Sequence, residues 1–120
     1  MKKVVVIDDN PLMFHLIKGW LNPNYIDVQY LNSLDKIIPM LNGFKPDLII
    51  SDILIPGISS TELIALFKQI AYPKVLVSSM DIQDIEFFAR QIDAINYFNK
   101  PINPKLLFQF LQDFFASNNK

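Results

Sequence analysis

Short apolar runs of strand length alternate with longer segments of helical periodicity along the chain. The runs at residues 4–7, 48–50 and 75–77 are apolar without alternation, as expected for strands that helices cover on both faces. A repeated order of strand and helix predicts βα units, in which a helix connects two parallel strands. Because such crossovers are right-handed, the pattern predicts a doubly wound parallel sheet.

We expect an α/β fold, with a doubly wound sheet of five parallel strands, five helices and the flavodoxin-like strand order 2-1-3-4-5. The expected strands lie near residues 2–7, 25–30, 46–51, 74–78 and 94–98. The second run has a mixed composition that suits an edge strand, and we expect it to contribute nothing chemical. The expected helices begin after Asn10-Pro11 and then lie near 33–42, 59–70, 82–92 and 103–116. Asn10 is a favourable N-cap, and Pro11 suits the first helical position.

The length and composition of the chain indicate a globular protein and exclude several other classes. At 120 residues the chain is long enough to bury a core without staples, and we expect one domain over residues 1–120. A net charge of −1 and a hydrophobic content of 51% argue against disorder and against a nucleic-acid-binding surface. The absence of cysteine excludes disulfide and thiolate chemistry. No run reaches the roughly 18 apolar residues of a membrane span, and the run after Lys2-Lys3 is too short for a signal peptide. We therefore expect a soluble, cytoplasmic protein.

Four of the expected strands end in residues that suit cation and phosphoryl chemistry. Asp8 and Asp9 follow the first strand, Asp52 the third, Ser78 the fourth and Lys100 the fifth. In an open parallel sheet, groups at the carboxyl ends of the strands meet at a switch point. Each residue alone has an ordinary explanation, such as a favourable charge or cap at a helix start or a solvated lysine. Their conjunction at four strand ends indicates a site.

The acids in this set predict a bound cation. Two unit charges about 4 Å apart interact at roughly 4 kcal/mol with an effective dielectric near 20, so three crowded carboxylates need compensation. Oxygen ligands with room for water favour Mg²⁺ or a similar hard ion. Asp8 and Asp9 are adjacent and point in opposite directions, so they are not equivalent ligands. Lys100 offsets part of the negative charge and can pair with an incoming phosphoryl oxygen.

With these residues in place, the chain resembles the receiver domain of two-component response regulators, and single-domain chemotaxis-type regulators in particular, over essentially its whole length. The matching motifs are Ile7-Asp8-Asp9-Asn10-Pro11, Asp52-Ile53-Leu54-Ile55-Pro56-Gly57, Ser78-Ser79 and Tyr97-Phe98-Asn99-Lys100-Pro101. Together they are highly specific. The chain departs from the family where glycines are common, at Ser60 and in the turn of Asp93 and Asn96. It also has Ser78 for the commoner threonine and Ile55 for a frequent methionine.

The resemblance implies a phosphorylation-dependent signalling switch. Asp52 is then the phosphoacceptor, which takes its phosphoryl group from a sensor histidine kinase or phosphotransfer protein. Mg²⁺ is held by Asp8, Asp9, Asp52 and the backbone carbonyl of Leu54, with Asp9 binding directly and Asp8 mostly through water. Such a protein is mainly a signalling module, with self-phosphorylation and self-dephosphorylation activity, that controls a downstream target or output domain.

The remaining motif residues have implied roles as well. Ser78 bonds the phosphoryl group after transfer, and Lys100 bridges carboxylate and phosphate. Tyr97 corresponds to an aromatic switch residue, and Pro101 to a position that is often cis. Leu54, with Met80, flanks the path of the water that attacks the phosphoryl group. Because neither side chain orients water, we expect a long-lived phosphorylated form.

Three other functions compete with this interpretation. Aspartate-nucleophile phosphatases typically need a second acid two residues after the nucleophile, where this chain has Leu54. A non-catalytic interaction module has no need of the five polar residues that this chain retains. A flavin-binding protein of similar topology needs a phosphate-cradling loop after the first strand, which the sequence lacks.

Surplus apolar residues predict where the signal leaves the molecule. They belong to the fourth helix, the fifth strand and the fifth helix, and are Ile82, Ile85, Ile95, Leu106 and Phe110. Single exposed hydrophobic residues need no explanation, but a contiguous patch usually marks an interaction site. We expect this face to bind a partner or a second copy of the chain, more tightly after phosphorylation. We expect no direct contact with nucleic acid or membrane.

Overall fold

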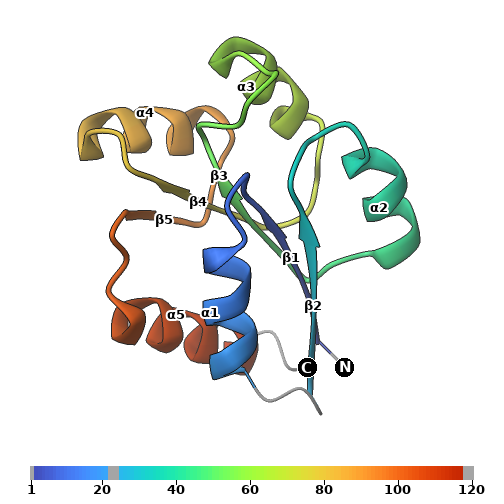
Figure 1. Ribbon diagram of the computed structural model, residues 1–120, viewed down its shortest axis with the longest axis vertical. Coiled ribbons are helices and arrows are strands. Elements are labelled where there is room, and N and C mark those ends of the chain that lie inside the picture. Colours follow the sequence, from blue (N-terminus) through green and yellow to red (C-terminus); the bar gives the residue numbers. More distant parts are fainter. Residues whose placement is uncertain (1, 22–24, 118–120) are drawn as a thin grey trace.

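Five parallel strands form one sheet in the computed structural model, which describes residues 2–21 and 25–117 (Figure 1). The strand order is β2-β1-β3-β4-β5, which confirms the predicted topology. The strands are β1 (Lys2–Ile7), β2 (Ile26–Leu31), β3 (Leu48–Asp52), β4 (Lys74–Ser78) and β5 (Asn96–Asn99). The β1–β3 pairing aligns Ile7 with Ser51, and the β3–β4 pairing aligns Asp52 with Val77. The carboxyl ends of the central strands therefore lie at one edge of the sheet.

Helices cover both faces of the sheet. They are α1 (Leu12–Trp20), α2 (Ile37–Phe44), α3 (Ser60–Lys68), α4 (Ile82–Gln91) and α5 (Pro104–Ser117). One buried cluster joins the sheet to α1 and α5, and a second joins it to α2, α3 and α4. Figure 1 shows the same division, with α1 beside α5.

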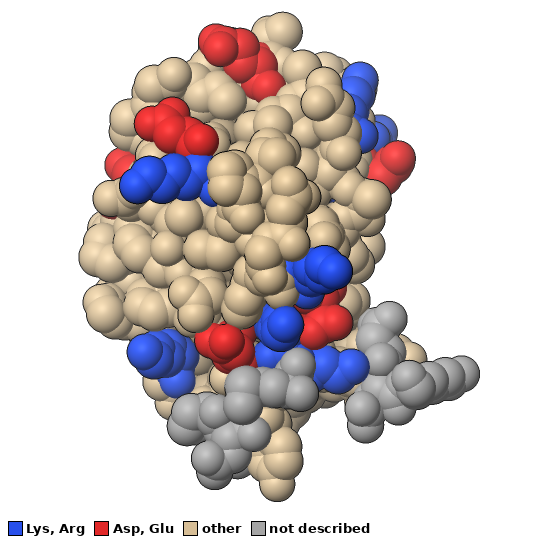
Figure 2. Space-filling model, turned by 90° about the vertical axis from the view of Figure 1, so that its right-hand side faces the viewer, with Lys and Arg blue, Asp and Glu red and all other residues tan. Residues whose placement is uncertain are grey.

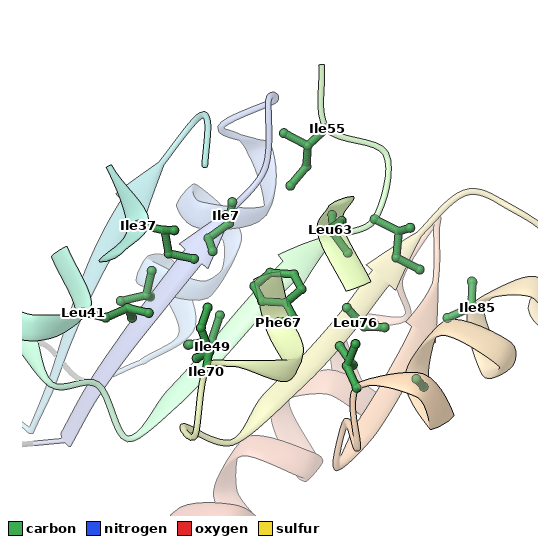
Figure 3. Close-up of a cluster of buried hydrophobic side chains, with 14 residues drawn as sticks. Ile7, Ile37, Leu41, Ile49, Ile55, Leu63, Phe67, Ile70, Leu76 and Ile85 are labelled. Carbon is green, nitrogen blue, oxygen red and sulfur yellow. The ribbon is translucent and has the colours of Figure 1, made fainter. Parts of the chain in front are cut away.

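The two clusters explain why the central strands are apolar without alternation. Val5, Ile7 and Ile49 belong to the cluster beneath α2, α3 and α4, whereas Val4 and Val6 belong to the one beneath α1 and α5. Figure 3 shows the cluster beneath α2, α3 and α4, with the Phe67 ring of α3 packed among aliphatic side chains. Both faces of each central strand are buried, so both sets of positions must be apolar.

Most predicted boundaries are correct to within two residues, with one larger difference. α2 begins at Ile37 instead of near residue 33, because residues 35–36 form a turn before it. α1 begins at Leu12, with Pro11 at the N-cap position; the Leu12 N–H donates to Asn10 Oδ1 at 2.9 Å. Asn10 therefore satisfies an amide of the first turn, although it lies one residue before the assigned cap.

Two local features shape the loop before α3 and the turn before β5. Ser59 caps α3 reciprocally with Glu62, and this Ser-x-x-Glu capping box is a sequence signal for the start of the helix. In the turn before β5, Asp93 has a φ of 54°. Asp93 therefore takes the left-handed conformation in this turn, at some conformational cost for a residue other than glycine.

The face of the molecule on the side of α2 and β2 is mixed in charge. Figure 2 views the molecule from the side of α2 and β2, where Lys or Arg and Asp or Glu side chains are interspersed and no field of one sign forms. Among the helices of residues 2–21 and 25–117, none has the length and apolar character that crossing a membrane requires.

Candidate functional site

The three predicted acids lie together at the carboxyl edge of the sheet. Asp8 follows β1, Asp52 is the last residue of β3, and Asp9 begins the loop into α1. One ligand oxygen from each acid lies within 4.8 Å of the others. Asp8 and Asp52 are buried, and Asp9 is exposed. Three carboxylates with an open side are a suitable ligand set for a hard divalent cation that keeps some of its water.

Lys100 joins two of these acids from the loop after β5. Its Nζ lies 2.8 Å from Oδ2 of Asp8 and 3.0 Å from Oδ2 of Asp52. Burial lowers the pKa of the Lys100 ammonium, but its hydrogen bonds to the two carboxylates outweigh burial, and its pKa is raised overall. Lys100 therefore stays cationic and neutralises part of the cluster.

Asp52 is held on both carboxylate oxygens. Oδ2 accepts from Lys100, and Oδ1 accepts from the Leu54 backbone N–H at 3.1 Å. Burial raises the pKa of Asp52 and prevails over Lys100 and the Leu54 N–H, which lower it. The carboxylate is thus close to a cation but poorly solvated, a condition typical of reactive groups. The contact from Leu54 also places that residue's backbone beside the cluster, where its carbonyl was predicted to act.

Asp8 has a partner for every polar atom. Its Oδ1 accepts from the Asn10 N–H at 3.0 Å, and its Oδ2 accepts from Lys100. Its own N–H donates to the carbonyl oxygen of Leu31 at 3.1 Å, and its carbonyl oxygen accepts from the Tyr30 hydroxyl at 2.7 Å. Two of these partners come from β2, so the expectation that the second strand contributes nothing chemical was wrong.

The hydroxyl of Tyr30 is a dependable donor. Burial raises the pKa of this phenol, and the negative charges of Asp8 and Asp9 raise it further. The sequence analysis missed Tyr30, because no motif signals a phenol that reaches the backbone of a neighbouring strand.

Ser78 ends β4 and is fully buried, one residue beyond the strand partner of Asp52. Its Oγ accepts from the Met80 N–H at 3.3 Å. Asn99, which sequence reasoning also missed as a functional residue, donates from Nδ2 to the carbonyl oxygens of Ser78 and Met80 at 3.0 and 2.8 Å. These bonds fix the loop after β4 next to β5. The Lys100–Pro101 peptide bond, at the position that the resemblance implied is often cis, is cis.

Tyr97 lies on β5 and is half-buried. It packs against the cluster that contains Ile85 and Ala89 of α4. It also lines a cavity of about 370 Å³ together with residues of α4 and of the turn before β5. The expected switch residue therefore touches the helix that follows Ser78.

The predicted apolar patch is only partly correct. Ile82, Ile95 and Leu106 are exposed. Ile85 is 0% exposed, because it shares the inward face of α4 with Ala89, four residues later. Its assignment to the surface was wrong, and Figure 3 shows it among the core side chains.

Phe110 also differs from the prediction. It is half-buried, with its ring 5.8 Å from that of Phe98 and 6.1 Å from that of Phe114. Phe110 therefore packs α5 against Phe98 of β5, and its ring is not available as an exposed surface. The sequence analysis overlooked Phe87 of α4, which is exposed.

Comparison with known families gives a match over most of the chain. The sequence model of the response regulator receiver domain matches residues 4–112. A sensory transduction protein, BceR, of Halalkalibacterium halodurans is 27% identical over 93% of this chain and 49% of its own length. The PhoP regulator of alkaline phosphatase synthesis from Bacillus subtilis is 24% identical over 87% of this chain and 44% of its own length. This chain thus spans about half the length of these curated relatives. Protein PilH of Pseudomonas aeruginosa is 21% identical over 89% of this chain and 92% of its own length.

Solved structures share the fold. A two-component response regulator from Clostridium difficile superposes with a TM-score of 0.83 at 21% identity, and the alignment covers 100% of both chains. The BeF3-activated N-terminal receiver domain of Klebsiella pneumoniae RstA gives a TM-score of 0.76 at 28% identity, over 92% of this chain and 96% of its own.

Proposed function

The chain belongs to the response regulator receiver domain family, and on that premise we propose that it is a phosphorylation-dependent signalling switch with Asp52 as its phosphoacceptor. The observation that carries the proposal is the contact of Lys100 with both Asp52 and Asp8, at 3.0 and 2.8 Å. It sets the Lys100 ammonium against Asp52, the strand-end acid that also lies close to Asp8 and Asp9. We assign this role to a single receiver domain over residues 1–120.

In the proposed reaction, an oxygen of Asp52 attacks the phosphorus of a phosphohistidine on a partner protein. The O–P bond forms as the N–P bond breaks, and the histidine ring retains the electron pair and takes up a proton. Lys100 remains protonated. Its ammonium would shift its hydrogen bond from the Asp52 carboxylate to a phosphoryl oxygen as negative charge develops there. Ser78, one residue further along the adjacent strand, would then donate to a phosphoryl oxygen. The protein thus supplies positioning and charge compensation, as phosphoryl transfer requires.

Asp8, Asp9, Asp52 and the carbonyl of Leu54 are the proposed ligands of Mg²⁺. When bound, the ion supplies charge neutralisation to the phosphoryl oxygens. Asp8 is buried, and its Oδ2 is paired with Lys100. Asp9 is exposed and belongs to the same cluster. These contacts support direct binding by Asp9 and an indirect, water-mediated role for Asp8.

The partners follow from the family. We propose that a sensor histidine kinase or a phosphotransfer protein donates the phosphoryl group, and that a downstream target or output domain receives the signal. Tyr97 and Ser78 would carry the change to the face of α4, β5 and α5. The exposed residues Ile82, Ile95 and Leu106 make that face suited to an apolar contact.

One experiment separates this function from the competing ones. The protein is incubated with acetyl phosphate in Mg²⁺ or in EDTA, and its mass and visible absorbance are recorded. A receiver gains one phosphate in Mg²⁺ only, and the phosphorylated form lasts long enough to be detected by mass spectrometry. An interaction module gains none, a phosphatase releases phosphate with turnover, and a flavin protein shows flavin absorbance.

A further inference from the structure

The Asp8–Asp9 peptide is anchored from the edge strand. Asp8 lies between β1 and α1, outside the regular ladder, yet β2 holds both its N–H and its carbonyl oxygen. The carbonyl is the acceptor side of the peptide bond that leads into Asp9. A contact that fixes this carbonyl fixes the peptide plane, and with it the direction in which the Asp9 side chain leaves the backbone.

Tyr30 is itself held in place for that contact. It follows Val28 on the strand face that α1 covers. Its ring stacks on Phe14 of α1, with centroids 5.3 Å apart and planes inclined by 26°. On α1, Lys18 places its Nζ 5.4 Å from the centre of the Phe14 ring. The stack on Phe14 restricts the rotamers of the phenol ring, so its hydroxyl is held toward Asp8 before any cation binds.

The geometry points to Tyr30 as a positioning residue for the cation site. Its hydroxyl, by holding the Asp8 carbonyl at 2.7 Å, sets the orientation of Asp9. The inference rests on the proposed function, because it concerns the ligands of the proposed Mg²⁺ site. It goes beyond that function because it assigns a role to Tyr30 of β2, a residue outside the strand-end set. That role is to control how well Asp8 and Asp9 are arranged.

The chain provides a matched control. Tyr72 also donates its hydroxyl to a backbone carbonyl, that of Leu41 at 3.4 Å, and is also half-buried. It precedes β4, at the end of the sheet opposite the acids. Tyr72→Phe therefore removes the same kind of bond without touching the site, whereas Tyr30→Phe removes the bond to Asp8 and keeps the ring on Phe14.

The test compares wild type, Tyr30→Phe and Tyr72→Phe by three measurements. Calorimetric titration gives the Mg²⁺ dissociation constant, thermal unfolding gives the general loss of stability, and amide hydrogen exchange in EDTA follows Asn10, whose N–H bonds to Asp8 Oδ1. We expect the dissociation constant to rise about tenfold in Tyr30→Phe only, the low end for losing a group that supports a metal ligand. Asn10 exchange should accelerate about fivefold in Tyr30→Phe, as the loss of one net hydrogen bond implies.

The outcomes are distinct. Equal Mg²⁺ affinity in wild type and Tyr30→Phe overturns this inference and leaves the proposed function intact. A parallel loss of affinity in Tyr72→Phe also overturns it, because the effect would then be one of stability alone. A wild type that binds no Mg²⁺ overturns the proposed function and this inference with it.

Discussion

The Nζ atom of Lys100 lies 3.0 Å from Oδ2 of Asp52, across 48 residues of sequence. Lys100 follows β5 and Asp52 ends β3, so the contact spans β4, which lies between them in the sheet. The same ammonium reaches Asp8 beyond β1, at 2.8 Å. The Lys100 ammonium therefore connects the ends of β1, β3 and β5. Its single positive charge lies near three carboxylates, those of Asp8, Asp9 and Asp52. The site is left with excess negative charge, and this has consequences that can be measured.

Asp52→Asn should stabilise the metal-free protein near neutral pH. Burial holds the pKa of Asp52 above its unfolded value, so ionisation begins to oppose folding above the unfolded pKa and does so fully above the folded pKa. Asparagine removes this charge and can still accept from the Leu54 N–H. Urea unfolding in EDTA should give Asp52→Asn the larger free energy of unfolding.

The pH dependence of that difference provides its control. As the pH falls through the raised pKa, wild-type Asp52 becomes protonated, and the advantage of the variant should shrink. Asp35→Asn, which changes an exposed acid before α2, should show no such trend. A wild type as stable as Asp52→Asn at neutral pH would contradict the assigned burial cost.

Mg²⁺ affinity should depend on Asp9 more than on Asp8. Asp9 offers an exposed carboxylate, whereas Asp8 is buried and its Oδ2 is paired with Lys100. In calorimetric titrations Asp8→Asn should weaken binding by about tenfold, as for a group that acts through another ligand, and Asp9→Asn by more. Trp20 is a poor reporter, because it ends α1 and lies one helix length from the acids. Equal losses in the two variants would refute the order.

The phosphorylated form should be long-lived. Leu54 and Met80 line a common cavity of about 370 Å³, with Phe88 and residues of the loop after β3. Neither side chain can orient an attacking water. Leu54→Asn with Met80→Glu should therefore speed phosphate loss by about tenfold, less than the roughly hundredfold of a positioned acid or base. Phosphate release after removal of the donor measures the rate, and an unchanged lifetime would refute the explanation.

Self-association after activation should depend on Leu106, whose side chain is 61% exposed. Sedimentation velocity with and without beryllofluoride should show wild type associating in the activated state. Leu106→Glu should weaken this by about tenfold or more, because burying an unpaired carboxylate in an apolar contact costs more than the roughly 1–3 kcal/mol of an unpaired neutral polar group. Ile38→Glu, on α2, is the control. Phe110→Glu is unsuitable, since its ring packs on Phe98. A wild type that is monomeric in both states would exclude binding of a second copy at this face and leave only binding of a different partner protein.

The main lines of this fold could be predicted because they depend on local sequence. Unpatterned apolar runs mark strands buried on both faces, and parallel strands must bring their carboxyl ends to one edge. Asp8, Asp52 and Lys100 were therefore placed together before any contact was known. Hydrogen bonds to near neighbours in the same loop, such as that from the Leu54 N–H to Asp52, follow from the short separation in sequence.

The remaining features depend on how elements pack. Ile82 and Ile85 are three residues apart on α4, and only the rotation of the helix on the sheet decides that Ile85 is buried. The bond from Tyr30 to Asp8 requires both the β1–β2 register and the position of α1. Lys74 begins β4 yet is buried, which lowers the pKa of its ammonium. A lysine in a strand gives no sequence signal of that kind.

The central claim is that Asp52 carries the phosphoryl group, and intact-protein mass spectrometry with peptide mapping tests it most directly. Wild type, Asp52→Asn and Asp35→Asn are incubated with acetyl phosphate and Mg²⁺. We predict one added phosphate on wild type and on Asp35→Asn, mapped to Asp52, and none on Asp52→Asn. Undiminished labelling of Asp52→Asn, or a phosphate mapped to another residue of wild type, would contradict the account.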